Sequence, residues 1–214
     1  MDNATINYVE DYVNIGLPRD AAAILLIEVD GHPAQVADEA VSVEKVLKDS
    51  GALEVVVAKD AAEKTRIWEA RRVAIPALAR CRPTLMLEDA TVPRSKIPAM
   101  LEALDKIAAR HHVTIGTFGH AGDGNLHPSI LCDKRDKEEF SRVERAVDDL
   151  FNVALELGGT LSGEHGIGTS KKKWLEHAAY ALRFRSEEAA QRFEDRFPLG
   201  CSVTVDGGSA ADRF

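Results

Sequence analysis

Two histidines flank a short glycine-containing segment near the middle of the sequence, FGHAGDGNLHPSI at residues 118–130. His120 and His127 are seven positions apart, so a continuous strand would point them to opposite faces of a sheet. If Asp123 and Gly124 instead form the two-residue loop of a hairpin, His120 lies directly opposite His127. Their Cβ atoms would then be roughly 4.5–5.5 Å apart, a separation that suits two ligands of one metal ion.

A second glycine-rich segment, GGTLSGEHGIG at residues 158–168, supplies a carboxylate and a third imidazole. Glu164 and His165 are adjacent there, directly after a long helical pattern. Imidazole nitrogens and carboxylate oxygens suit zinc, iron or manganese, and three protein ligands leave positions open for a substrate. The residues alone leave an alternative open, in which the hairpin histidines only hydrogen-bond each other or solvent.

The elements that would hold these segments alternate between strand-like and helical patterns. Apolar runs predict strands, and patterns with the 3.6-residue period predict helices. The predicted strands cover residues 23–29, 54–58, 84–92, 113–120 and 125–132, and the predicted helices cover 36–51, 60–80, 95–112 and 136–159. Their order predicts an α+β sandwich in which an antiparallel or mixed sheet carries helices on one face, followed by a glycine-rich loop and a helical segment.

The composition excludes several classes of function. Apolar residues make up 45% and charged residues 29% of the 214 residues, and the formal net charge of −8 argues against a nucleic-acid partner. The three cysteines are widely spaced and indicate neither a disulfide framework nor a zinc ribbon, which favours a reducing, cytoplasmic compartment. The longest apolar run, residues 21–29, is far shorter than the ~20 residues of a membrane-spanning helix, so no membrane segment is expected.

The two motifs together, GHAGDGNLHP and GGTLSGEHGIG, resemble the C-terminal half of the FAD-dependent 2-hydroxy acid dehydrogenases. That family contains the flavin subunit of glycolate oxidase, the D-lactate dehydrogenases and D-2-hydroxyglutarate dehydrogenase. The resemblance extends over roughly residues 20–175 and includes the segments IWEARRVAIPAL and LEDATVPR. It implies a ferredoxin-like cap domain beside a flavin-binding domain.

The resemblance implies a role for each polar residue of the motifs. It makes His120, His127 and Glu164 the ligands of a divalent metal, zinc or else iron or manganese, and His165 the catalytic base. The metal would lower the pKa of the substrate's 2-hydroxyl group, while a hydride leaves C2 of the substrate for FAD.

Two further residues match family positions outside the metal set. Arg71, three residues after Trp68, matches the arginine that holds the substrate carboxylate, which a guanidinium can grip with two parallel hydrogen bonds. Asn125 matches a position near the flavin and the substrate, and Glu164 is placed with it as a cofactor-binding residue. The alternative for Arg71 is that it only covers a solvated face of its helix. The alternative for Asn125 is that it is an asparagine with no role beyond the turn.

The chain is predicted to have three parts. Residues 1–20 are expected to form an N-terminal arm or linker, residues 21–175 the cap domain, and residues 176–214 a divergent tail with a helix beginning at Ser186 and disorder beyond it. No segment of the sequence matches the family's N-terminal FAD-binding domain, so FAD is expected to be shared with another domain or chain.

The sequence therefore predicts the substrate- and metal-binding portion of an enzyme that oxidises a D-2-hydroxy acid, such as lactate, glycolate or 2-hydroxyglutarate, to the 2-oxo acid. Its expected partners are this small substrate, a flavin-binding domain or chain, and an iron-sulfur subunit; any association with a membrane would be through such partners. The alternative is a non-catalytic metal-binding module, or a truncated remnant without its flavin domain.

Overall fold

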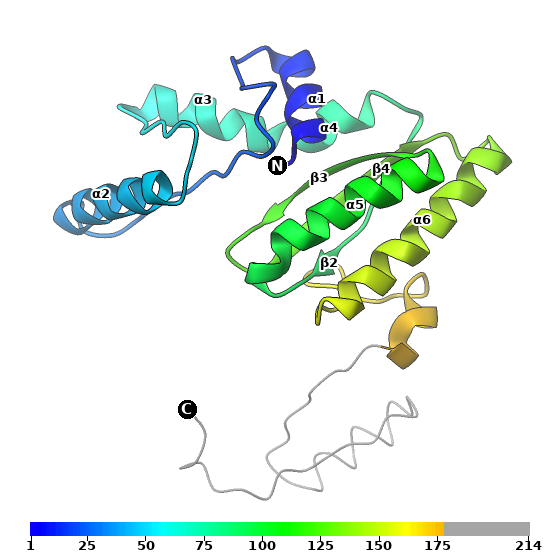
Figure 1. The fold of residues 1–214 in the computed structure, drawn as a ribbon. Helices are drawn as coiled ribbons and strands as arrows, with labels where there is room; N and C mark the ends of the chain where they lie inside the picture. Colours follow the sequence, from blue (N-terminus) through cyan, green and yellow to red (C-terminus); the bar gives the residue numbers. More distant parts are fainter. Residues whose placement is uncertain (178–214) are drawn as a thin grey trace, which may run out of the picture. The chain divides into compact units, whose positions relative to one another are not determined.

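The computed structural model describes residues 1–177, and the chain divides into two compact units, Met1–His165 and Gly166–Phe214 (Figure 1). The first unit contains the α-helices and strands of the described residues, and the second contains a short 3-10 helix, η2 (Lys172–His177). The helix predicted at Ser186 and the predicted disorder of the tail lie outside the described residues. Within residues 1–177, no helix is both long and apolar enough to cross a bilayer.

An antiparallel sheet of four strands forms the centre of the first unit. Its middle strand is β4 (Asn125–Cys132), which pairs along one edge with β3 (Thr114–His120). Along its other edge β4 pairs in succession with β1 (Thr84–Leu87) and β2 (Ala90–Thr91). β4 is buried along its whole length, as expected for a strand with neighbours on both edges. The predicted α+β class with an antiparallel sheet is confirmed.

Two long helices, α5 (Ile97–His111) and α6 (Lys137–Glu156), pack against each other and against the sheet (Figure 1). α6 begins after Asp136, whose carboxylate accepts hydrogen bonds from two backbone amides of the first turn. α5 follows a 3-10 turn, η1 (Arg94–Lys96), and has a proline, Pro98, in its first turn. The buried residues of α6 recur at intervals of three and four and form one apolar stripe: Val143, Ala146, Val147, Leu150, Phe151 and Ala154.

A separate group of helices, α1 (Asn3–Val13), α3 (Ala61–Arg72) and α4 (Ala74–Ala79), surrounds a second part of the core. The continuous helix predicted over residues 60–80 is divided between α3 and α4. Pro76 explains the division, because it cannot donate the hydrogen bond that a continuous helix needs at that position. This part of the core joins small and apolar side chains of the helices to two residues of the sheet: Val9, Ala70, Ala74, Ala77, Leu78, Phe118 and Leu131.

Helix α1 also corrects a prediction about the start of the chain. Residues 1–20 were expected to form an arm or linker, and this is wrong for residues 3–13, because Ile6 and Val9 of α1 are fully buried. Asp2 caps the helix by accepting a hydrogen bond from the amide of Thr5.

Residues 24–58 are the least buried part of the first unit. They include helix α2 (Pro33–Asp49), which was predicted but has no buried residue. The strands predicted at residues 23–29 and 54–58 are wrong, since neither segment pairs as a strand. A strand needs a neighbour to satisfy its backbone groups, and apolar character alone does not supply one. Large apolar side chains therefore remain exposed along this part of the chain: Leu25, Ile27, Val41, Val46, Leu53, Val56 and Val57.

Candidate functional site

The β3–β4 hairpin brings the two motif histidines to one side of the sheet, although not in the predicted register. A four-residue loop, residues 121–124, joins the strands, so that His120 pairs with Asn125 and His127 pairs with Phe118. The predicted two-residue loop, with His120 directly opposite His127, is therefore wrong. The difference is a shift of two residues, which leaves every side chain on its predicted face. The histidines still meet, with their ring centroids 5.5 Å apart.

Glu164 completes a cluster of three possible metal ligands. Its carboxylate oxygens lie 3.3 Å from Nε2 of His120 and 3.8 Å from Nε2 of His127. One ligand atom from each of the three residues lies within 4.8 Å of the other two. His127 is buried, whereas the side chains of His120 and Glu164 are about half exposed, at 44% and 48%. The structure thus brings together the three residues that the sequence analysis assigned to a metal, in a cluster that is open on one side.

His165 lies beside this cluster, stacked on the ring of His127. The two ring centroids are 5.2 Å apart and the ring planes differ by 10°. Burial lowers the pKa of His127, although the carboxylates of Glu164 and Asp89 act in the opposite direction. His127 is therefore neutral at neutral pH, the form in which an imidazole binds a metal. Its Nδ1 atom is buried and has no hydrogen-bond partner among residues 1–177.

The carboxylate of Asp89 holds the backbone of the loop that carries Glu164 and His165. Asp89 is fully buried in the two-residue interruption between β1 and β2. It accepts hydrogen bonds from the hydroxyl of Ser162 at 2.5 Å and from the backbone amides of Gly163, Glu164 and His165 at 2.8 to 3.1 Å. Burial alone would raise the pKa of Asp89, but these hydrogen bonds hold it well below its usual range.

Sequence reasoning assigned no role to Asp89. The available signal was a pair of acidic residues, Glu88 and Asp89, in the middle of a strand pattern, TLMLEDATV. An acidic residue at a buried position needs hydrogen-bond donors around it, and here the glycine-rich loop supplies them.

Glycine allows the same loop to lie directly against β2 and β4. Thr91 of β2 and Thr160 exchange two backbone hydrogen bonds, at 2.7 and 3.2 Å. A Cβ atom at Gly163 would lie 2.4 Å from Oγ1 of Thr91 and 2.7 Å from the carboxamide of Asn125. A side chain at this position would push the loop, and Glu164 with it, away from the histidines.

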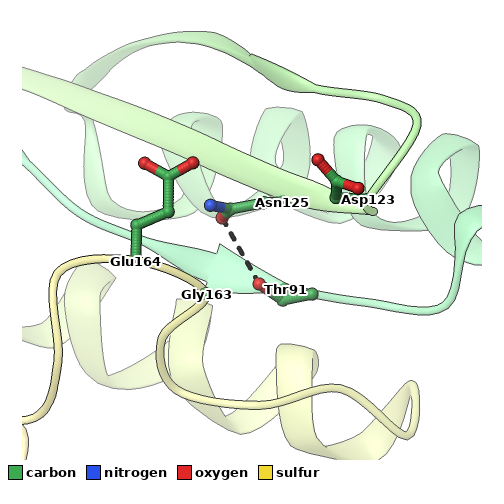
Figure 2. Close-up of a pocket in the computed structure, with 5 residues that line it drawn as sticks. All are labelled: Thr91, Asp123, Asn125, Gly163 and Glu164. Atoms are coloured by element: carbon green, nitrogen blue, oxygen red, sulfur yellow. Dashed lines mark hydrogen bonds between the residues drawn. The ribbon is translucent and has the colours of Figure 1, made fainter.

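An open pocket of about 240 Å³ adjoins the cluster and is lined by Thr91, Asp123, Asn125, Gly163 and Glu164. Figure 2 shows the carboxamide of Asn125 between the carboxylates of Glu164 and Asp123, with its Oδ1 atom accepting a hydrogen bond of 3.3 Å from Oγ1 of Thr91. The Nδ2 atom of Asn125 is buried and has no partner within the described part of the chain. The pocket is therefore continuous with the cluster through Glu164, and the Nδ2 donor of Asn125 has no hydrogen-bond acceptor among the described residues.

Arg71 approaches the site from the last turn of α3. Its guanidinium carbon lies 4.8 Å from the ring centroid of Phe118, and that ring lies 5.6 Å from the ring of His127. Arg71 forms no ion pair with a carboxylate of residues 1–177, so its charge is not neutralised there. Sequence reasoning did not identify Phe118, although its place two residues before His120 put both side chains on one face of the strand.

Comparisons with known proteins identify the family of the chain. The family model for FAD linked oxidases, C-terminal domain, matches residues 1–185 of the chain. Glycolate oxidase subunit GlcD of Bacillus subtilis (strain 168) is 49% identical over 176 residues, which cover 82% of this chain and 37% of that protein. GlcD of Escherichia coli (strain K12) is 40% identical over 171 residues, covering 80% of this chain and 34% of the relative. D-lactate dehydrogenase of Anaerostipes hadrus is 31% identical over 180 residues, which cover 82% of this chain and 38% of that protein.

The chain thus spans between 34% and 38% of the length of each of these relatives. The matched part includes both motifs, the helix that carries Arg71 and the strands of the central sheet. The chain belongs to the family of FAD linked oxidases, and it corresponds to their C-terminal domain.

Proposed function

We propose that this chain forms the substrate- and metal-binding portion of a FAD-dependent dehydrogenase of D-2-hydroxy acids. The observation that carries the proposal is the convergence of His120, His127 and Glu164, with His165 stacked on one member of the cluster. The relatives' names support the substrate class, since glycolate and lactate are both 2-hydroxy acids. The specific acid, whether glycolate, D-lactate or D-2-hydroxyglutarate, is what the activity measurement below distinguishes.

The donor set of the cluster fits a divalent metal ion. Two imidazole nitrogens and a carboxylate suit zinc, with iron and manganese as alternatives. His127 offers a buried, neutral ring, and His120 and Glu164 offer their ligand atoms on the open side of the cluster. When bound there, such an ion would act as a Lewis acid toward the hydroxyl and carboxylate oxygens of the substrate.

His165 is the proposed general base. Its ring lies beside the ring of His127, and its backbone amide is held by Asp89. A neutral imidazole nitrogen at this place can accept the proton of the substrate's 2-hydroxyl group, while the hydride of C2 goes to FAD. Because Glu164 and His165 are neighbours in the chain, the base and a metal ligand are positioned by the same short loop.

Arg71 and Asn125 are proposed to bind the substrate and the cofactor. The guanidinium of Arg71, held over Phe118, carries a charge that a substrate carboxylate would neutralise with two parallel hydrogen bonds. The unused Nδ2 donor of Asn125 faces the pocket region and suits an acceptor atom of the flavin or the substrate. Glu164, which lines the same pocket, lies at the boundary between the metal and the cofactor.

Partner chains form part of the proposal. The chain spans about a third of its relatives, and two of these are named as subunits of glycolate oxidase. We therefore propose that turnover needs a flavin-binding domain or chain. An iron-sulfur subunit stays a prediction of the sequence.

Metal content is the first test of the proposal. Inductively coupled plasma mass spectrometry on the purified full chain should find close to one zinc, iron or manganese ion per chain, and His127→Ala should lose it because the buried ligand is gone. His32→Ala is a matched control, since His32 is an exposed histidine at the start of α2. Equal metal in the wild type and in His127→Ala would contradict the proposed site.

A second measurement separates the catalytic proposal from the alternative of a non-catalytic metal-binding module. The full chain is mixed with the flavin-binding part of the Bacillus subtilis relative, and flavin reduction is followed with glycolate, D-lactate and D-2-hydroxyglutarate. Reduction by one of these acids, lost in His165→Ala, supports the dehydrogenase. Bound metal without flavin reduction by any of them would favour the binding module.

A further inference from the structure

We infer that Asp89 is a positioning residue, whose buried carboxylate fixes residues 162–165 so that Glu164 and His165 face His127. The importance of this loop for catalysis rests on the proposed function, whereas the way in which the loop is held does not. Asp89 is neither among the residues that line the pocket nor a member of the cluster. Besides the effect of its charge on the pKa of His127, it acts on the site through the residues that it holds.

The loop has no regular structure of its own to fix its conformation. Residues 162–165 belong to neither a helix nor a strand, and their amides make no ladder of hydrogen bonds with a neighbouring strand. Instead, three consecutive amides, of Gly163, Glu164 and His165, all point at the one carboxylate of Asp89. Three successive donors that converge on one acceptor determine the backbone dihedral angles between them.

The amides that Asp89 holds belong to the residues that make the site's contacts. Glu164 approaches Nε2 of His120 and Nε2 of His127, and His165 stacks on the ring of His127. A change at Asp89 therefore changes the position of the carboxylate and the third imidazole together. The hydroxyl of Ser162 adds a fourth hydrogen bond to the same carboxylate and ties the start of the loop.

Asparagine at position 89 tests this inference, because it keeps the shape of the side chain and removes the charge. The amide group of asparagine has only one acceptor oxygen, and its NH₂ group would face donors of the loop. Glu10→Gln is a matched control. Glu10 is another buried carboxylate that accepts three backbone amides, those of Ile15, Gly16 and Leu17, at a place remote from the site in the sequence.

The first readout is independent of any metal. Amide hydrogen exchange is measured on the metal-free full chain for the wild type, Asp89→Asn and Glu10→Gln. Exchange at residues 163–165 should accelerate by roughly tenfold or more in Asp89→Asn, whereas in Glu10→Gln exchange should accelerate at residues 15–17 and not at residues 163–165. Unchanged exchange at residues 163–165 in a folded Asp89→Asn chain would overturn the inference.

A spectroscopic signature distinguishes positioning from a general loss of stability. In the wild type, a nuclear Overhauser cross-peak between the ring protons of His127 and His165 should report their stacking. The cross-peak should disappear in Asp89→Asn and persist in Glu10→Gln. If Asp89→Asn does not fold, Ser162→Ala removes one of the four donors and should weaken the cross-peak. A cross-peak that persists at full strength in the folded variant would also overturn the inference.

Metal affinity then connects the inference to the proposed function. If the wild type binds zinc, Asp89→Asn should weaken that binding by roughly tenfold or more, as expected for a residue that orients a ligand, and Glu10→Gln should leave it unchanged. Equal zinc affinity in Asp89→Asn would show that Asp89 does not position Glu164 as a ligand. A wild type that binds no metal would refute the proposed metal site, while exchange and the cross-peak would still decide the role of Asp89.

Discussion

The guanidinium of Arg71 is stabilised by an aromatic face instead of a carboxylate. It lies over Phe118, and Phe118 lies beside His127, so the three side chains form a continuous row toward the cluster. A cation over an aromatic ring keeps its hydrogen-bond donors at the edge of the guanidinium free. Arg71 is therefore prepared to bind an anion without first breaking an ion pair among the described residues.

This arrangement predicts that lysine cannot replace Arg71. In Arg71→Lys, the affinity of the metal-loaded chain for D-lactate should fall roughly tenfold, because a point charge replaces a planar fork with two parallel donors. Isothermal titration calorimetry measures the affinity. Arg72→Lys is the control, since the neighbouring guanidinium is exposed and donates to a backbone carbonyl of its own helix. Equal losses in the two variants would contradict a specific role for Arg71.

At the scale of elements, the hairpin shows how much of the site could be predicted from sequence. The Asp-Gly pair correctly indicated a turn, and the alternation of strand residues correctly placed both histidines on one side. The length of the loop was not predictable from that pair alone, because the backbone hydrogen bonds that define the register depend on both strands. Here the backbone amide of Asp123 donates a hydrogen bond to the carbonyl oxygen of His120, which makes a four-residue turn.

Helices and strands differed in how well the sequence predicted them. α6 begins after a capping aspartate, α5 has a proline in its first turn, and both helices have an apolar stripe with a helical period. Residues 23–29 and 54–58 carried only apolar character, and a strand also requires a partner that lies elsewhere in the chain. The role of Asp89 could not be predicted from the sequence for the same reason. The hydrogen-bond donors of residues 162–165 that surround its carboxylate lie more than 70 positions later in the chain.

A close contact in the hairpin gives a prediction for Gly119. A Cβ atom there would lie 2.3 Å from the carbonyl oxygen of Asn125 and 2.9 Å from Cα of Leu126, both in the paired strand. Gly119→Ala should therefore lower the free energy of unfolding by about 2–3 kcal/mol, because backbone atoms must move apart. Urea denaturation followed by circular dichroism measures it. Gly122→Ala, in open space in the loop, should lower the free energy of unfolding by less than about 0.5 kcal/mol. If Gly122→Ala lowered it as much as Gly119→Ala does, the close contact at Gly119 would not be the cause.

At the scale of the whole molecule, burial is uneven. The sheet with α5 and α6, and the cluster around α1, α3 and α4, bury the large apolar residues, including Ile6, Phe118, Leu150 and Phe151. Residues 24–58 leave theirs exposed. Because burial of apolar surface is the main stabilising term, the free energy of unfolding of the first unit depends on the two buried groups far more than on α2.

Acid should act on this fold through Glu10. Burial alone would raise the pKa of Glu10, but the amides of Leu17, Gly16 and Ile15 hold it below its ordinary value. A lowered pKa means that the carboxylate stabilises the fold above the pKa of the unfolded chain, about 4.3, and that this stabilisation is lost as the pH falls through the folded-state pKa.

Glu10→Gln tests this pH dependence. At pH 7 the variant should be less stable than the wild type by about 2 kcal/mol, the contribution of hydrogen bonds to a charged group. The difference should shrink as the pH falls below about 4, because the wild-type carboxylate then becomes protonated. Urea denaturation at several pH values measures both. A difference that stays constant down to pH 3 would show that the charge of Glu10 does not contribute.

The hydrogen bonds of Asp89 also restrict what the glycine-rich loop can recognise. Runs of backbone amides in such loops commonly cradle phosphate groups. In this chain the amides of residues 163–165 already surround an anion that belongs to the protein itself. A phosphate could enter only by expelling a buried negative charge. The amides of residues 163–165 are therefore not available to the pyrophosphate of a dinucleotide, and the groups that this part of the segment GEHGIG presents are the side chains of Glu164 and His165.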